Sequence, residues 1–247
     1  MFASADAIIH AGAAVPSARS SYGENELFDA NVRAVFNLAG WARKRQLPFV
    51  HISGAIVYAN PNGPDIREDA PLGWSGLGGS YGLTKLLAED VLRREEGRGL
   101  ALAILRPSSI YGYGLAAEKI ICSFLNRARE GAAIELSEPV DDGADLIHAA
   151  DVASAVVKVL KREAWETFNL GAGKCTSVRD LAATCISVAG EGTIEITDGD
   201  GPPRPPERRF GLNCQLANER LGWSARIGLP EGLRAVLEHE VLVVHTA

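Results

Sequence analysis

The sequence predicts an α/β fold in which helices cover both faces of a doubly wound parallel sheet. Three apolar runs, at residues 7–11, 49–53 and 100–105, lack the polar alternation of a half-buried strand. Such runs are typical of strands that are buried on both faces. Segments with a helical spacing of apolar residues separate the runs, and this alternation predicts right-handed crossovers between parallel strands.

The remaining elements follow from local signals along the chain. The first helix is predicted over 24–45, with a buried side that consists of Leu27, Val32, Val35, Phe36 and Leu38. Ser177, with Asp180 three residues later, predicts a capped helix over 178–188. The other predicted elements are a strand continuing over 54–58, a surface loop over 60–79, helices over 80–91, 116–130 and 152–160, strands at 145–151 and 168–170, a loop over 201–209 and a final helix from about Pro230.

The composition restricts the class of protein. With 247 residues, 47% of them hydrophobic and 23% charged, the chain can bury one large core, or one core and a small lobe. A net charge of -6 argues against general binding to nucleic acid or to acidic membranes. Four widely spaced cysteines without a CxxC pair favour free thiols over disulfides or a metal site. The chain shows neither a signal segment nor an apolar run of membrane-spanning length, so we expect a cytoplasmic protein.

The most informative segment is 80–89, in which Tyr81 and Lys85 stand four residues apart. The apolar residues around them have helical spacing, so both side chains are expected on one face of a helix. An ammonium beside a phenol favours the phenolate and lowers the pKa of the tyrosine from about 10. Such a tyrosine can exchange a proton with a substrate hydroxyl near neutral pH. The alternative is a solvated helix face, which is the commoner origin of this spacing.

Small or polar residues follow two of the predicted strands. After the first strand, small side chains at Ala11 and Gly12 would let a ligand approach the backbone, although an ordinary turn would look the same. Ser53 ends the second strand and could bind a substrate oxygen, but a hydroxyl that caps the turn is the commoner case. Asn31 lies in an apolar stretch, where a buried amide is either a structural cross-link or part of a polar relay.

Short motifs along nearly the whole chain resemble, in order and spacing, the extended short-chain dehydrogenases/reductases of the NAD-dependent epimerase/dehydratase type. The motifs are residues 6–11, Asn31–Val32, Ser53 with Val57–Tyr58, Pro71–Leu72, residues 81–85, Leu105–Pro107 with Tyr111–Gly112, residues 145–148 with Asp151–Val152, residues 168–171 and residues 221–223. Each motif is weak alone, but their shared order makes coincidence improbable.

The resemblance implies a Rossmann-like sheet that binds NAD, with NADP as the alternative, and it gives roles to the matched residues. Tyr81 would be the general acid or base, Lys85 would hold the nicotinamide ribose, and Ser53 would bind the substrate oxygen. Cofactor contacts are implied for His10, Ala11, Gly12, Asn31, Ser53, Tyr81, Lys85, Pro107, Ser108 and Ile110. Substrate contacts are implied for Ser109, Asn169, Arg208 and Arg209, although the two arginines could equally lie in a solvated loop.

The same resemblance divides the chain and suggests its reaction. Residues 1–112, with part of 145–170, would form a partial cofactor domain, and 113–247 would mainly form a substrate-binding lobe. The expected reaction transfers hydride between the nicotinamide and a sugar or nucleotide sugar, as in an epimerase, dehydratase or oxidoreductase. The alternatives are a reductase of a non-nucleotide carbonyl compound and a non-catalytic binding or scaffold protein. The implied partners are this small molecule and a second copy in a homodimer, without a metal ion.

One departure from the family pattern concerns the cofactor. The glycine-rich turn that holds the pyrophosphate, and the acidic residue that binds the adenosine ribose, have no match in the chain. The first three strands of the family fold are therefore expected to be missing. The strand at 7–11 would then form an exposed apolar sheet edge, and we expect the chain to bind NAD more weakly than in the micromolar range.

A second departure concerns the substrate. The Ser or Thr of the family stands four residues before the position of Tyr58, which is Gly54 here, and Ser53 is one residue earlier. Either a local insertion lets Ser53 serve or the hydroxyl is missing, which would weaken orientation in the transition state. Ser109 stands where many nucleotide-sugar epimerases carry Asn, which weakens the expectation of a nucleotide diphosphate sugar.

Overall fold

A four-stranded parallel sheet in the order β1-β2-β4-β8 forms the centre of the computed structural model, which describes residues 5–16, 22–197 and 205–245. The four strands are β1 (Ile8–His10), β2 (Phe49–Ile52), β4 (Leu102–Pro107) and β8 (Thr167–Leu170). Each neighbouring pair is parallel. The predicted α/β class with a parallel sheet is confirmed.

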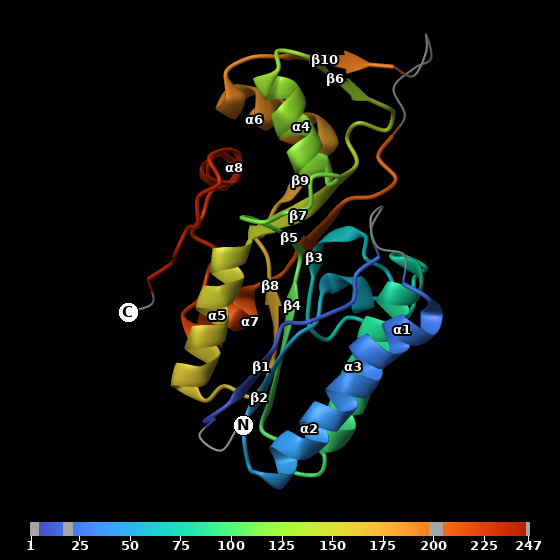
Figure 1. The fold of residues 1–247 in the computed structure, drawn as a ribbon, viewed down its shortest axis with the longest axis vertical. Coiled ribbons are helices and arrows are strands. Elements are labelled where there is room, and N and C mark those ends of the chain that lie inside the picture. The colour runs from blue at the N-terminus through green and yellow to red at the C-terminus, as the bar shows by residue number, and fades with distance from the viewer. Residues whose placement is uncertain (1–4, 17–21, 198–204, 246–247) are drawn as a thin grey trace.

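Helices cover both faces of this sheet (Figure 1). One face carries α1 (Glu24–Phe28), a π-helical turn (Asp29–Arg33), α2 (Ala34–Lys44) and α3 (Gly79–Glu96). The other face carries α5 (Ala149–Arg162) and α7 (Gln215–Leu221). Within β2, Phe49 packs in the cluster with α2 and α3, whereas the next residue, Val50, packs in the cluster with α5 and α7. Because both faces are covered, successive strand positions must be apolar.

The first predicted helix is confirmed in extent but not in its buried side. It runs from Glu24 to Lys44 as α1, the π turn and α2. Leu27, Val32 and Val35 are buried as predicted, but Phe36 is 51% exposed and Leu38 is 37% exposed. After the π turn the buried stripe continues through Ala39 and Ala42, at the three- or four-residue spacing of a helix. Phe36 and Leu38 lie outside that stripe.

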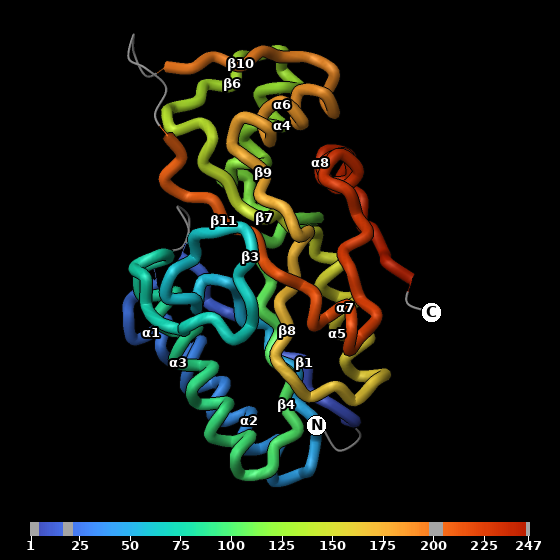
Figure 2. The backbone as a smooth tube through the Cα atoms, turned by 180° about the vertical axis from the view of Figure 1, so that it is seen from behind, coloured from blue at the N-terminus to red at the C-terminus, as the bar shows by residue number. Residues whose placement is uncertain are grey.

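The remaining elements form a lobe beyond the carboxyl ends of the strands (Figure 1). A second apolar core joins α4 (Ile120–Arg129), α6 (Val178–Ala189) and α8 (Leu229–Leu237) to a ribbon of β6 (Ala133–Leu136) and β10 (Thr193–Ile196). A small sheet of β5 (Ser109–Tyr111), β7 (Gly143–His148) and β9 (Cys175–Ser177) connects this core to the main sheet. In Figure 2, β3 (Gly63–Ile66) and β11 (Phe210–Leu212) lie side by side.

Several local predictions can be compared with these elements. The cap of α6 is confirmed, since the Asp180 amide donates to Ser177 Oγ at 2.9 Å, and all four cysteines are free. The predicted loop over 60–79 instead contains β3, and residues 55–57 form a 3-10 turn rather than a strand. β3 was not predicted because its sequence, Gly-Pro-Asp-Ile, is typical of a turn, and its partner β11 lies far away in the sequence.

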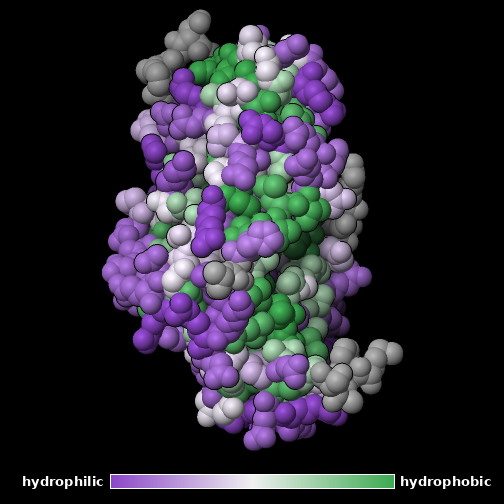
Figure 3. All heavy atoms as spheres, turned by 90° about the vertical axis from the view of Figure 1, so that its left-hand side faces the viewer, coloured by the Kyte–Doolittle hydropathy of each residue, from purple (hydrophilic) through white to green (hydrophobic). Residues whose placement is uncertain are grey.

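Among the described strands, β1 forms one edge of the main sheet, as the sequence predicts. Ile9 is 52% exposed there. Figure 3, which faces the left-hand side of Figure 1, shows hydrophobic atoms gathered in the middle and lower part of that side. Within the described ranges, no helix has both the length and the apolar character that crossing a membrane requires.

Candidate active site

The candidate site lies where β2 and β4 end and α3 begins. The residue before α3, Gly78, has φ of 71°, which favours glycine. In the first turn of α3, a Cβ added at Gly82 would clash with the carbonyl oxygen of Leu77. Glycine at this position therefore lets the preceding loop pack against the helix and brings Tyr81 to its first turn.

Tyr81 and Lys85 lie on the same face of α3, as the spacing predicts. Lys85 Nζ lies 5.8 Å from the centroid of the Tyr81 ring and donates to the carbonyl oxygen of Ile52 at 2.9 Å. Lys85 is only 5% exposed. Burial lowers the pKa of Lys85 to about 8, and the negative charge of Glu89 opposes this shift. The ammonium thus lies directly beneath the end of β2.

The expected lowering of the Tyr81 pKa is wrong for this structure. Burial raises the pKa of Tyr81 above its ordinary value of 10. The ammonium of Lys85 approaches the Tyr81 ring, but the hydrogen bond that it makes is to the Ile52 carbonyl. The loss of water around the phenol is therefore what sets the direction of the shift.

A cleft of 470 Å³ opens above these strand ends. Six predicted site residues line it, namely Ser53, Tyr81, Pro107, Ser108, Ser109 and Ile110, and so does Gly54, at the position where the family carries its hydroxyl. A Cβ added at Gly54 would make only ordinary contacts, at 3.8 Å to Ile56 and 3.9 Å to the Pro107 oxygen. The backbone at Gly54 is extended, with φ of 172°, which any residue can adopt. Packing therefore does not require glycine at this position.

Ser53 lines the cleft, but its hydroxyl hydrogen points into the protein. Ser53 Oγ donates to Glu89 Oε1 at 2.5 Å, and both side chains are buried. A hydroxyl has one hydrogen to donate, so only the lone pairs of Ser53 Oγ can face a ligand in this arrangement. Donation from Ser53 to a substrate oxygen stays a prediction, and this orientation does not favour it.

The loop after β1 is held in place by Asn31. The Ala14 amide donates to Asn31 Oδ1 at 2.7 Å, and Asn31 Nδ2 donates to the Ala14 oxygen at 2.9 Å and to Thr84 Oγ1 at 3.0 Å. The geometry therefore favours the structural cross-link, which joins the predicted cofactor loop to α3. His10 contacts His51 through their Nδ1 atoms at 3.2 Å, while Ala11 and Gly12 are exposed.

The four predicted substrate residues separate into two groups. A second hollow of 510 Å³ adjoins the cleft, and Ser109, Lys119 and Arg208 line it. Lys119 lines both spaces and was not predicted from the sequence. Arg209 is exposed, and its amide donates to Asn62 Oδ1 at 3.0 Å.

Asn169 is fully buried, which corrects the expectation that it contacts substrate. Its side-chain amide donates to the carbonyl oxygens of Ile66 and Asn213, at 2.9 and 3.2 Å, and its Oδ1 accepts from Tyr58 at 2.6 Å. Every polar atom of this side chain has a partner in the interior, so Asn169 links segments rather than facing the cleft. Among the described residues, no group of three or more His, Cys, Asp or Glu could hold a metal ion.

A family model described as the NAD dependent epimerase/dehydratase family matches residues 1–171. The chain belongs to this family.

Curated proteins related to this family member include sugar-nucleotide enzymes. It is 31% identical over 242 residues to dTDP-L-rhamnose 4-epimerase of Burkholderia thailandensis, a match that covers 92% of the chain and 63% of that protein. It is 29% identical over 251 residues to a putative UDP-glucose 4-epimerase of Methanocaldococcus jannaschii, covering 96% of the chain and 77% of that protein. The chain thus spans less than two thirds of the length of the first of these relatives.

Solved structures share the fold of this family member. UDP-glucuronic acid 4-epimerase from Bacillus cereus, in complex with NAD, has a TM-score of 0.80 at 19% identity, covering 96% of the chain and 75% of the other. dTDP-glucose 4,6-dehydratase from Bacillus anthracis, also in complex with NAD, has a TM-score of 0.77 at 20% identity, covering 95% and 72%. At such identities the likeness shows the fold alone.

The cleft of this family member fits one half of the family's cofactor, NAD. Tyr81 and the segment from Pro107 to Ile110 line a space in which Gly54 contributes no side chain. That arrangement suits a flat nicotinamide ring and its ribose. Beside β1, residues 11–16 form a loop, and no helix N-terminus follows β1 directly in the described part of the chain.

Proposed function

We propose that this chain carries the substrate-side chemistry of an NAD-dependent epimerase, dehydratase or oxidoreductase that acts on a sugar or nucleotide sugar. The observation that carries the proposal is the Tyr81–Lys85 pair on one face of α3, with Tyr81 in the wall of a cleft above the ends of β2 and β4. Open α/β sheets bind their ligands at this edge. The curated relatives are named as enzymes that act on UDP- and dTDP-linked sugars, which supports the same class.

Each residue of the pair has a definite task. Bound NAD supplies a nicotinamide ring that accepts or donates hydride. A phenol is protonated at neutral pH, and burial raises the pKa of Tyr81 further, so Tyr81 can donate a proton to a carbonyl oxygen. In the reverse direction, Tyr81 must lose that proton, and the Lys85 ammonium 5.8 Å from the ring centroid stabilises the phenolate.

The second hollow favours a nucleotide sugar over a simple carbonyl compound. Lys119 and Arg208 bring two cations, and Asp142 one carboxylate, to a space that adjoins the cleft and is otherwise lined mainly by apolar side chains. A lysine and an arginine there would neutralise a diphosphate, and the apolar wall would take up a base. We further propose that residues 113–247 mainly form the substrate lobe.

The family resemblance also leads us to propose a cytoplasmic location and a homodimer. The exposed side chains of Phe28, Phe36 and Leu83 would lie in the dimer interface.

The test is turnover of a UDP- or dTDP-sugar with NAD at saturating concentration. Replacing Tyr81 with Phe removes the transferred proton, so we expect the Tyr81→Phe variant to lose a factor of about 10² to 10⁴ in kcat. The dissociation constant of NAD, measured by calorimetry, should stay the same. Tyr113→Phe is the matched control, because Tyr113 is 61% exposed and lies outside the cleft. Unchanged turnover in the Tyr81→Phe variant would remove Tyr81 from its role.

The second candidate is a binding or scaffold protein without catalysis, and Gly54 is the observation that favours it. A side chain fits at Gly54 without clash, so the Gly54→Ser variant should fold normally and restore a hydroxyl beside Tyr81. If the chain is an enzyme with a weakened site, this variant should raise kcat about tenfold or more. If neither the native chain nor the Gly54→Ser variant turns over any sugar nucleotide, the scaffold role is favoured.

A further inference from the structure

We propose that Glu89 is a positioning residue of this site, which orients the Ser53 hydroxyl and places a carboxylate one helical turn from the Lys85 ammonium. This inference rests on the proposed function, because Glu89 can assist catalysis only if the chain is an enzyme. The experiment that tests it does not require turnover.

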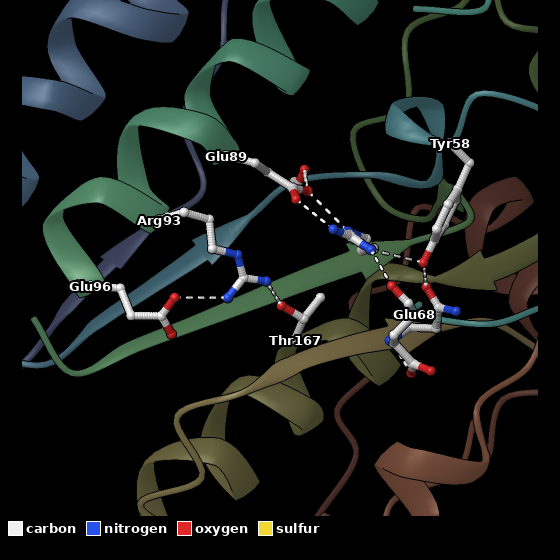
Figure 4. A network of polar contacts seen from close by, with 9 residues as sticks. Tyr58, Glu68, Glu89, Arg93, Glu96 and Thr167 are labelled. Atoms are coloured by element: carbon white, nitrogen blue, oxygen red, sulfur yellow. Dashed lines mark hydrogen bonds and ion pairs between the residues drawn. The ribbon is translucent and has the colours of Figure 1, made fainter. Parts of the chain in front are cut away.

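Glu89 belongs to the same face of α3 as the proposed catalytic pair. Tyr81, Lys85 and Glu89 follow one another at intervals of four residues in an unbroken helix. Side chains at this spacing lie one above the other on a helix. Glu89 is 1% exposed, and its carboxylate points from α3 toward the sheet (Figure 4). A row of phenol, ammonium and carboxylate thus lies along the helix where it crosses the ends of β2 and β4.

Two residues fix the carboxylate of Glu89. Arg106 Nε donates to Glu89 Oε1 at 3.1 Å, and Arg106 Nη2 donates to Oε2 at 2.7 Å. Ser53 Oγ also donates to Oε1. A two-pronged contact between guanidinium and carboxylate leaves little rotational freedom, so the acceptor for the Ser53 proton has a defined place.

Arg106 is itself held by a buried network, which Figure 4 shows. Its Nη1 donates to Tyr58 Oη at 3.2 Å and to the Glu68 carbonyl oxygen at 3.0 Å. Tyr58 in turn donates to Asn169 Oδ1. A buried ion pair is tolerated only when its remaining polar groups are satisfied, and these contacts satisfy them. The network joins α3, β4 and β8, so Glu89 stands at one end of a rigid frame.

The charge of Glu89 acts on Lys85. Removing water from a lysine favours its neutral form, and Lys85 is 5% exposed. Glu89 is the group whose charge opposes that effect. A neutral Lys85 could neither attract ribose hydroxyls as an ammonium nor stabilise a Tyr81 phenolate. An ion pair that served packing alone would not need to affect the titration of Lys85, and this difference separates the two explanations.

The test measures the titration of Lys85 directly. Lysine labelled with 13C at Cε reports the charge of its own amine in NMR spectra, and a Lys85→Arg variant assigns the signal. We expect Glu89→Gln to lower the titration midpoint of Lys85 by about one pH unit, because the stabilising charge is lost. Asp90→Asn is the matched control: it removes a carboxylate from the next position of α3, where Asp90 pairs with Arg94 on the exposed face. This control should leave the midpoint unchanged.

The outcomes either support or overturn the proposal. An unchanged Lys85 midpoint in a folded Glu89→Gln variant overturns it, and so does an equal shift in Asp90→Asn. If Glu89→Gln does not fold, a double variant with Arg106→Met removes the buried carboxylate together with its counter-charge. Because the lost cation offsets part of the lost anion, we expect a smaller lowering of the midpoint, and an unchanged midpoint again overturns the proposal. A chain that turns over no sugar nucleotide would refute the proposed function but would leave this titration readable. In an active chain, the pH dependence of kcat should shift with the midpoint.

Discussion

The two edges of the main sheet are built in opposite ways. At β8, Phe168, Asn169 and Leu170 are buried, and the Asn169 amide ties the strand to Ile66 and Asn213. At β1, among the described strands, the backbone pairs only with β2, and Ile9 is 52% exposed. At the β8 edge, hydrogen bonds from Asn169 hold neighbouring segments in a fixed geometry, whereas the β1 edge exposes apolar surface.

This difference indicates which part of the site is held rigidly. The proposed catalytic helix α3 is anchored to the β8 side through Glu89 and Arg106, each of which has several charged or polar partners. The proposed cofactor loop after β1 depends on Asn31 and on the contact between His10 and His51. We therefore expect substitutions on the β8 side to cost stability, and changes on the β1 side to act on pH dependence and association.

The largest expected effect comes from breaking the network behind β8. Arg106→Met would leave the buried carboxylate of Glu89 without its counter-charge and would remove a donor from Tyr58. Loss of one partner from a buried ion pair destabilises a protein by about 3–5 kcal/mol. Urea unfolding followed by circular dichroism measures the change in the free energy of unfolding.

An exposed ion pair on α3, the helix that carries Glu89, provides the control. Arg94 pairs with Asp90 at 3.1 Å, with side chains that are 74% and 60% exposed. Arg94→Met should change the free energy of unfolding by less than about 1 kcal/mol, since solvent screens such pairs. If the Arg106 and Arg94 variants lose equal stability, the β8 edge does not depend on this network.

A smaller effect is expected at the contact between β1 and β2. Burial lowers the pKa of His10, and it lowers the pKa of His51 well below 6.5; the positive charge of Lys85 adds to both shifts. The unfolded chain therefore binds more protons than the folded chain as the pH falls below 6.5, and stability is lost there. Each such histidine costs up to about 1.4 kcal/mol per pH unit in this range.

The measurement is urea unfolding at a series of pH values from 7.5 to 5. Replacing His51, which is 1% exposed, with Gln removes one titrating group, so His51→Gln should lose less stability on acidification than the native chain. His239 is exposed and lies in the segment after α8, so His239→Gln should keep the native pH dependence. A His51→Gln profile parallel to the native one would show that His51 does not cause the loss of stability on acidification.

The fold could be predicted because its signals are local. Apolar runs with no polar alternation indicate strands covered on both faces, and β2 and β4 are such strands. The i,i+4 spacing of Tyr81 and Lys85 predicted their common face, and the Ser177 cap predicted the start of α6. These inferences need only the period of a helix or strand.

Tertiary contacts could not be read in this way. Asn169 matches the family motif, yet its amide partners, Ile66 and Asn213, come from segments distant in the sequence. The pKa of Tyr81 depends on the water that folding removes, which no spacing reveals. Glu89 was missed although it continues the four-residue spacing of Tyr81 and Lys85, a signal that extending the pattern by one turn would have found.

The smallest expected change in stability concerns the β1 edge itself. Ile9→Lys places a charge on a side chain that is 52% exposed, so the free energy of unfolding should change by no more than about 0.5 kcal/mol. Charged residues on an edge strand discourage pairing between sheets, so self-association should decrease, as measured by sedimentation at increasing concentration. Val241→Lys is the control, since Val241 is 68% exposed but lies outside every strand. If both variants reduce self-association equally, general surface hydrophobicity rather than the open edge of β1 drives the association. The β1 and β8 edges would then differ in their contribution to stability alone.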